Sequence, residues 1–154
     1  MTETTIPISR PRGGLPRIER SLLLARVFLV AMAAPALVRL PLSALERFLE
    51  PRRPPPPADA PTVARVSACV ERVLRGGGPW IRPGCLTRGV TRYYFLRRAG
   101  MELRLCFGAT LTAGGRLSGH CWLERDGRPY LEEGDPRTAF VVMHRIPSAL
   151  PRPA

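Results

Sequence analysis

Two residues of this chain have the types and the setting of a nucleophile and its base. Cys85 opens a helix-like run over 85–98, and His120 lies in a strand-like segment over 119–124. A thiolate at a helix N-terminus is stabilised by the positive end of the helix dipole and by unpaired backbone N–H groups. A histidine on a neighbouring strand can then accept the proton. The pair therefore predicts acyl chemistry that starts from a cysteine nucleophile.

A Cys-His pair needs a third group that accepts a hydrogen bond from the imidazole and holds the ring in place. The chain contains no asparagine, so this group must be an acid. The candidates follow His120 in the sequence and are Asp126, Glu132, Glu133 and Asp135.

Hairpin geometry around the turn at 126–127 separates these candidates. A three-residue turn with a G1 bulge brings Glu132 opposite His120, with Cβ atoms ~5 Å apart. A two-residue turn shifts the register by one residue and brings Glu133 opposite instead. We prefer the bulged turn and Glu132, with Glu133 as the second choice.

Roles can also be assigned to the oxyanion donors, to the other three cysteines and to the second histidine. The oxyanion is expected to bind the backbone N–H of Cys85 and one donor from Trp80 or the 80–84 loop. The other three cysteines lie in apolar periodic segments and are interpreted as buried, unreactive thiols: Cys69, Cys106 and Cys121. His144 has no clear partner and is interpreted as structural.

Composition limits the classes of protein to which the chain can belong. Its 154 residues are 45% hydrophobic, enough for one domain with a proper core. The net charge is +12, but all 24 basic residues are arginine and none is lysine, which is typical of a GC-rich genome. The arginines are scattered among few aromatic residues, so nucleic acid is not an expected partner. No Cys-x-x-Cys pair and no signal peptide is found, so we expect no metal, no cofactor, no disulfide framework and a cytoplasmic location.

Five segments follow one another along the chain. We expect a flexible tail over 1–20, an apolar helical segment over 21–50, a Pro-rich connector over 51–61, the main domain over 62–146 and a tail over 147–154. Arg26, Pro35 and Arg39 interrupt the apolar segment, so packing on the domain or docking of a partner is favoured over contact with a membrane. Helices followed by antiparallel strands predict an α+β domain.

Three stretches of the sequence resemble the transglutaminase-like leader peptidases of lasso peptide biosynthesis. They are the helix start at 85–88, the helix-to-strand passage at 96–105, and the strand at 119–124 with the turn at 126–128. The similarity covers roughly residues 62–145, and the segment from Leu22 to Leu49 resembles the helical N-terminal region of the stand-alone members.

The resemblance implies a papain/transglutaminase-like fold with the cysteine at a helix N-terminus, packed on an antiparallel sheet that carries the histidine and the acid. It implies a cysteine peptidase that removes the leader from a ribosomally made precursor peptide before macrolactam cyclisation. Cys85 would be the nucleophile, His120 the base, and Glu132 the acidic third member, which is usually aspartate in the family.

The same resemblance implies partners. A separate leader-recognition protein is expected to deliver the precursor peptide, because the first 60 residues lack a winged-helix pattern. A separate ATP-using cyclase that resembles asparagine synthetase would close the ring. Two alternatives stay open: a non-catalytic transglutaminase-like binding module, and another acyl-transfer enzyme of the same fold.

Overall fold

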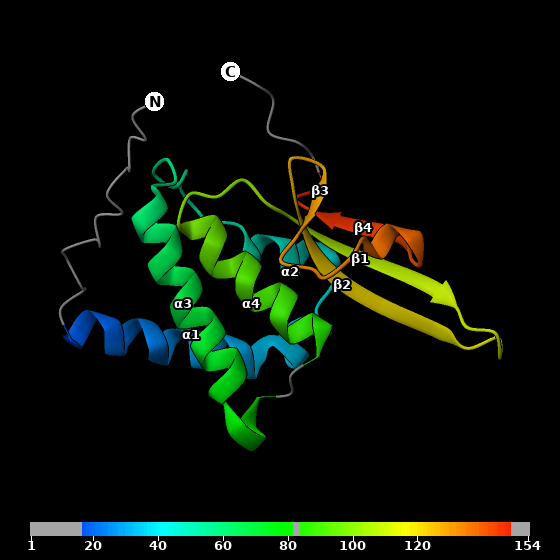
Figure 1. Cartoon of the computed structure of the whole chain (residues 1–154), viewed down its shortest axis with the longest axis horizontal. Helices are drawn as coiled ribbons and strands as arrows, with labels where there is room; N and C mark the ends of the chain where they lie inside the picture. Colours follow the sequence, from blue (N-terminus) through cyan, green and yellow to red (C-terminus); the bar gives the residue numbers. More distant parts are fainter. Residues whose placement is uncertain (1–16, 82–83, 149–154) are drawn as a thin grey trace, which may run out of the picture.

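The computed structural model describes residues 17–81 and 84–148 of the chain. Within these residues, helices precede a four-stranded antiparallel sheet, so the arrangement is α+β, as the sequence predicts (Figure 1). The helices are α1 (Arg17–Leu37), α2 (Leu42–Leu49), α3 (Ala60–Gly76) and α4 (Cys85–Arg98). The strands are β1 (Arg104–Leu111), β2 (Leu117–Arg125), β3 (Arg128–Tyr130) and β4 (Val141–Ile146), with short 3-10 turns η1 (Gly78–Trp80) and η2 (Pro136–Thr138).

The tails expected over 1–20 and 147–154 lie largely outside the described residues. Residues 17–20 form the first turn of α1. Ser148 donates from its backbone N–H and its hydroxyl to the Glu46 carboxylate of α2, the N–H at 2.7 Å.

Local signals in the sequence account for the bounds of α3. The Asp59 carboxylate accepts a hydrogen bond from the Thr62 N–H at 2.9 Å. Pro61 lies in the first turn, where its missing N–H leaves no hydrogen bond unmade. The helix therefore begins at Ala60, slightly before the boundary expected at 62, and it ends at Gly76, the first of three consecutive glycines.

The Pro-rich connector lies against the end of α4. Gly100 follows this helix with a φ of +90°, and a Cβ there would meet the carbonyl oxygen of Pro56 at 2.2 Å. Both the left-handed backbone and the close approach require glycine. The connector over 51–61 is thus packed on the domain.

α4 is buried on two sides and lies at the centre of the molecule (Figure 1). One side packs Val90, Tyr93 and Leu96 on the sheet and on α2. The other side packs Phe95 against a second cluster formed by α1 and α3. An amphipathic pattern in a sequence identifies one apolar stripe, whereas α4 uses two.

The strand order is β3-β2-β1-β4, with β1 and β2 as the central pair. The face toward α4 contributes Leu105, Cys121 and Leu123 to the core, as alternation in the sequence predicts. The opposite face is also buried at Cys106, as expected for this thiol, and at Trp122, each 0% exposed. The segment after β3 folds back over this face, and Phe140 approaches both Gly108 and the His120 ring.

The preferred turn at 126–127 is wrong. Arg125 pairs with Arg128 in the ladder, so Asp126 and Gly127 alone form a two-residue turn. Both residues have positive φ, 50° and 72°, as a type I′ turn requires. This turn is favoured because its twist matches that of the two flanking strands.

α1 is apolar on two opposite faces. The inner face packs on α3 and α4. The outer face exposes a stripe of side chains at helical spacing: Ile18, Leu22, Leu29 and Met32. By length and composition α1 could also cross a membrane, a test that the core helix of a soluble protein passes too. One face of α1 therefore belongs to the folded domain, and the other offers an apolar surface for an interaction.

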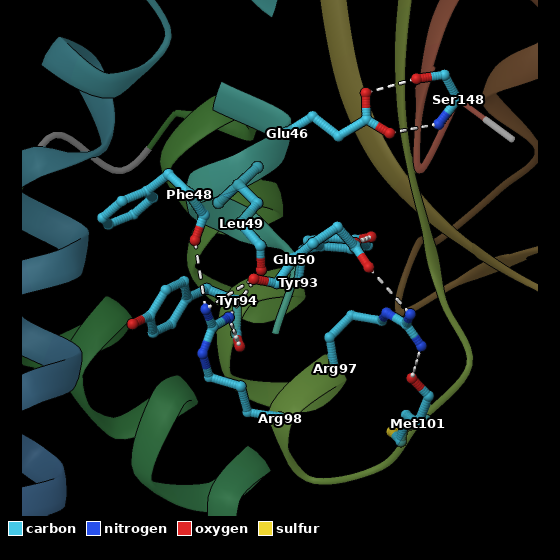
Figure 2. Close-up of polar contacts among 10 residues, drawn as sticks. All are labelled: Glu46, Phe48, Leu49, Glu50, Tyr93, Tyr94, Arg97, Arg98, Met101 and Ser148. Carbon is cyan, nitrogen blue, oxygen red and sulfur yellow. Dashed lines mark hydrogen bonds and ion pairs between the residues drawn. The ribbon is translucent and has the colours of Figure 1, made fainter. Parts of the chain in front are cut away.

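Polar contacts attach α2 to α4 (Figure 2). The Arg98 guanidinium donates to the carbonyl oxygens of residues 48–50 at 2.7–3.3 Å, where a cation complements the C-terminal end of the α2 dipole. Arg97 donates to Glu50 at 3.1 Å, and the Tyr93 hydroxyl donates to the same carboxylate. Burial and the Glu50 carboxylate raise the pKa of the Tyr93 hydroxyl.

α4 packs tightly against the sheet at Gly89. A Cβ at this position would meet Cys121 Sγ at 2.7 Å and Leu105 Cδ1 at 3.2 Å. Cys121 is 3% exposed, so its sulfur has little room to move. Glycine here lets the helix backbone rest on β2 directly beside His120.

We predict that Gly89→Ala destabilises the protein, although alanine favours a helix by ~1 kcal/mol over glycine. Overpacking against Cys121 should cost about 1–3 kcal/mol and outweigh that gain. In a Cys121→Ala background the contact with the sulfur is gone and only the contact with Leu105 Cδ1 remains, so the cost of Gly89→Ala should be smaller. Urea unfolding of the four proteins measures the coupling. Equal costs of Gly89→Ala in both backgrounds would contradict the proposed contact.

Candidate active site

Cys85 is the first residue of α4, as the sequence predicts. Gly84 precedes it as the N-cap, and among the described residues no side-chain hydrogen bond caps the helix. The first backbone N–H groups of α4 therefore have no side-chain acceptor and remain available to an anion. Cys85 is half-buried, whereas the other three cysteines are buried.

A cavity of about 530 Å³ opens in front of Cys85. It brings together the three residues that sequence analysis selected: Cys85 from α4, His120 from β2 and Glu132 from the loop after β3. Its remaining walls come from the same helix and from the segment that covers the sheet: Arg88, Arg92, Leu131, Glu133, Gly134, Asp135, Pro136, Thr138 and Phe140.

His120 is held by an acid and by two aromatic rings. Its Nε2 lies 3.4 Å from Glu132 Oε2. Its ring stacks on Phe140 with centroids 5.1 Å apart and on Trp122 at 5.9 Å. The stacking limits rotation of the imidazole, and the carboxylate favours the tautomer that carries its proton on Nε2. Nδ1 then remains the basic nitrogen.

Glu132 reaches His120 by a route that the sequence argument did not foresee. Continued pairing after the two-residue turn would place Glu133 opposite His120. The strand instead ends at Tyr130, and Leu131 adopts a left-handed conformation with a φ of 60°. This conformation takes the chain out of the ladder, so the acid belongs to a loop and not to the sheet. Glu133 is exposed and has no ion pair with any residue in the described ranges.

The other thiols differ from Cys85 in their surroundings. Burial raises the pKa of Cys106 to about 12, with the charge of nearby Glu124 as a further cause. Burial also raises the pKa of Cys121 well above its ordinary value. Cys69 lies in α3 and is 8% exposed. A buried neutral thiol is a weak nucleophile.

Two residues considered in the sequence lie away from the cavity. Trp80 is 72% exposed and lines a separate groove with Leu24, Phe28 and Leu29 of α1. Its indole is therefore not placed as an oxyanion donor, and residues 82–83 of the expected donor loop lie outside the described residues. His144 lies on β4 beside Phe107, with ring centroids 6.3 Å apart.

Sequence reasoning missed several residues of the cavity. Arg88 and Arg92 follow Cys85 at i+3 and i+7, and this spacing alone would have placed them on its side of the helix. No comparable signal pointed to Phe140, because it comes from the segment that crosses the sheet. Among residues 17–81 and 84–148, no group of His, Cys, Asp and Glu side chains is placed to hold a metal ion.

Comparison with known families agrees with this arrangement. The model of the transglutaminase-like superfamily matches residues 23–145, which is most of the chain. The chain therefore belongs to the transglutaminase-like superfamily, whose fold is that of cysteine-peptidase-like and acyl-transfer enzymes. No curated protein and no solved structure gives a significant match. The matched region begins in α1 and ends in β4, so it includes the N-terminal helices together with Cys85 and His120.

We predict that Cys85 is alkylated first in the folded protein. It is the half-buried thiol at a helix N-terminus, whereas Cys106 and Cys121 are buried and held neutral. Treatment with iodoacetamide at neutral pH, followed by peptide mapping, measures the order of labelling. Unfolding in urea should make all four rates similar. Faster labelling of Cys69, Cys106 or Cys121 in the folded state would count against the assignment.

We also predict that Glu132→Gln disturbs the His120 ring, because the amide no longer provides a charged acceptor for Nε2–H. Nitrogen-15 NMR of the imidazole should show one tautomer, protonated on Nε2, in the native protein and a mixture in the variant. Glu133→Gln is the matched control and should leave the spectrum unchanged. If only Glu133→Gln changed the tautomer, Glu133 and not Glu132 would be the partner of His120.

Proposed function

We propose that this protein is a cysteine peptidase that removes the leader peptide from a ribosomally synthesised lasso peptide precursor before macrolactam cyclisation. The observation that carries the proposal is the convergence of Cys85, His120 and Glu132 on one cavity. The superfamily supports acyl transfer or peptide cleavage in general. The narrower assignment rests on the resemblance of segments 85–88, 96–105 and 119–128 to the leader peptidases.

The residues of the cavity have the chemistry that peptide cleavage requires. His120 Nδ1 accepts the thiol proton, and the Cys85 sulfur attacks the carbonyl carbon of the leader's last residue. The backbone N–H of Cys85 and the positive end of α4 stabilise the oxyanion. The tetrahedral intermediate collapses as the imidazolium protonates the departing amine of the core peptide. A water molecule, deprotonated by His120, then hydrolyses the thioester and frees Cys85.

Glu132 acts on His120 and not on the substrate. By accepting the Nε2–H it keeps Nδ1 unprotonated and orients the ring, and it stabilises the imidazolium that forms during attack. Glutamate in place of the aspartate usual in the family adds one methylene group. The loop conformation at Leu131 supplies the geometry that accommodates the longer side chain.

The proposal includes two protein partners. A separate leader-recognition protein would deliver the precursor peptide, and an asparagine-synthetase-like cyclase would use the freed amine. The exposed outer stripe of α1 supports a protein partner, because a surface of this kind is rarely left uncovered. Cytoplasmic location is proposed because the precursor is made on ribosomes and the cyclase uses ATP.

The test requires a precursor peptide and a recognition protein, which are to be sought among the genes beside that of this chain. We predict efficient removal of the leader by the two proteins together and slow removal by this protein alone, measured by mass spectrometry. Cys85→Ala should abolish cleavage, and Cys69→Ala should not. Glu132→Gln should lower turnover, by less than the ~10⁴-fold found for a serine triad. Cleavage that survives in Cys85→Ala would refute the proposed chemistry, and efficient cleavage without the second protein would refute the need for a partner.

A further inference from the structure

The cavity in front of Cys85 has two walls of opposite charge. The α4 wall carries Arg88 and Arg92, and the loop wall carries Glu132, Glu133 and Asp135. Three of these five charges are already paired within the protein. Arg92 Nε bonds Glu71 at 2.7 Å, Glu132 contacts His120, and Asp135 bonds Arg137 at 2.6 Å.

Arg88 is the cation of this cavity that has no partner among the described residues. It is exposed, and neither a hydrogen bond nor an ion pair joins its guanidinium to residues 17–81 or 84–148. Other arginines of α4 differ from it: Arg92, Arg97 and Arg98 are all engaged by acids or carbonyl oxygens. The unpaired cation is thus the one nearest in sequence to Cys85.

Helix geometry directs Arg88 toward the nucleophile. It follows Cys85 by three residues, which places the two side chains on one face, ~4.5 Å apart along the axis. Side chains on a helix lean toward its N-terminus and cover the preceding turn. The Arg88 guanidinium therefore extends over the turn that begins with Cys85, at the mouth of the cavity.

We infer that Arg88 is a specificity-determining residue that binds a carboxylate of the peptide substrate close to the bond attacked by Cys85. A guanidinium offers only donors, in a planar fork that matches a carboxylate. Arg92, one turn further along, is already paired with Glu71, so Arg88 is left to meet the acid, while Glu133 repels it from the opposite wall. The substrate class is a peptide with an acidic side chain beside the cleavage site. This inference rests on the proposed function.

The experiment compares peptides that differ in one charge. Each of the three positions on either side of the scissile bond is occupied in turn by Glu, Gln or Lys, in the full precursor with its recognition protein. At one position the native protein should prefer Glu over Gln by about 2- to 5-fold in kcat/KM, mainly through KM, as expected for an exposed charge pair. Arg88→Gln should remove this preference, and Arg88→Glu should reverse it toward Lys.

Matched controls separate carboxylate binding by Arg88 from a general effect of charge or of stability. Arg116→Gln removes the same charge in the exposed turn between β1 and β2 and should leave the preference intact. Thermal unfolding should be unchanged in the Arg88 variants, because Arg88 makes no contact that folding requires. An absent preference in the native protein, or one that persists in Arg88→Gln, would overturn the inference. An equal fall in kcat for all peptides would assign Arg88 to the oxyanion and would overturn it as well.

Peptide binding can be measured without cleavage, so it separates failure of the inference about Arg88 from failure of the proposed peptidase function. The Cys85→Ala variant is titrated with fluorescent Glu and Gln peptides, and their Kd values are compared by polarisation. Tighter binding of the Glu peptide, lost on adding Arg88→Gln, supports the site even if the native protein cleaves nothing. Equal Kd values for the two peptides would overturn the site even if cleavage is efficient.

Discussion

The approach of α4 to β2 at Gly89 is the constraint on which the rest of the structure depends. Helix and strand meet where Gly89 lies against the Cys121 thiol, and there is no room for a side chain on the helix at this point. Cys121 is next to His120, and Cys85 lies one helical turn before Gly89. This contact therefore sets the distance between α4 and the sheet. It also sets the position of Cys85, the candidate nucleophile, relative to His120, its candidate base. A larger residue at 89 would lift the helix and with it Cys85.

The burial of α4 on both sides explains why this relation is rigid. Val90 and Leu96 pack toward the sheet, while Phe95 packs toward α1 and α3. At its C-terminal end the helix is attached to α2 by Arg98, whose guanidinium donates hydrogen bonds to three backbone carbonyl oxygens. A shift of α4 along its axis would break its contacts with the sheet, with α1 and α3, and with α2. The N-terminal helices thus support the site, although none of their residues lines its cavity.

The surroundings of His120 depend on the segment that follows β3. The segment after β3 leaves the sheet at Leu131, brings Glu132 to the imidazole and then returns across the second face with Phe140. An acid on a continuous strand would have its position dictated by the ladder. An acid on a loop takes its position from the loop's own conformation, and this freedom lets the longer glutamate meet His120.

Much of this arrangement could be read from the residues alone. The bounds of α4, the α+β order and the choice of Glu132 as the partner of His120 all agree with the structure. The reason given for Glu132 was nevertheless wrong. A bulged turn and a continuous strand were expected, whereas a two-residue turn and a left-handed Leu131 produce the same contact. The error in the turn and the error in the strand cancelled each other, so Glu132 was still the residue selected.

The sequence by itself determined the features that depend on neighbouring residues. Asp59 and Pro61 start a helix, Gly100 ends one, and the alternation in β1 marks a strand, because each acts through local backbone geometry. Only the tertiary structure decided the burial of Trp122, the second packed side of α4, the separation of Trp80 from the cavity and the arrival of Phe140 beside His120. These depend on segments far apart in the chain, whose meeting is set by packing and not by local periodicity.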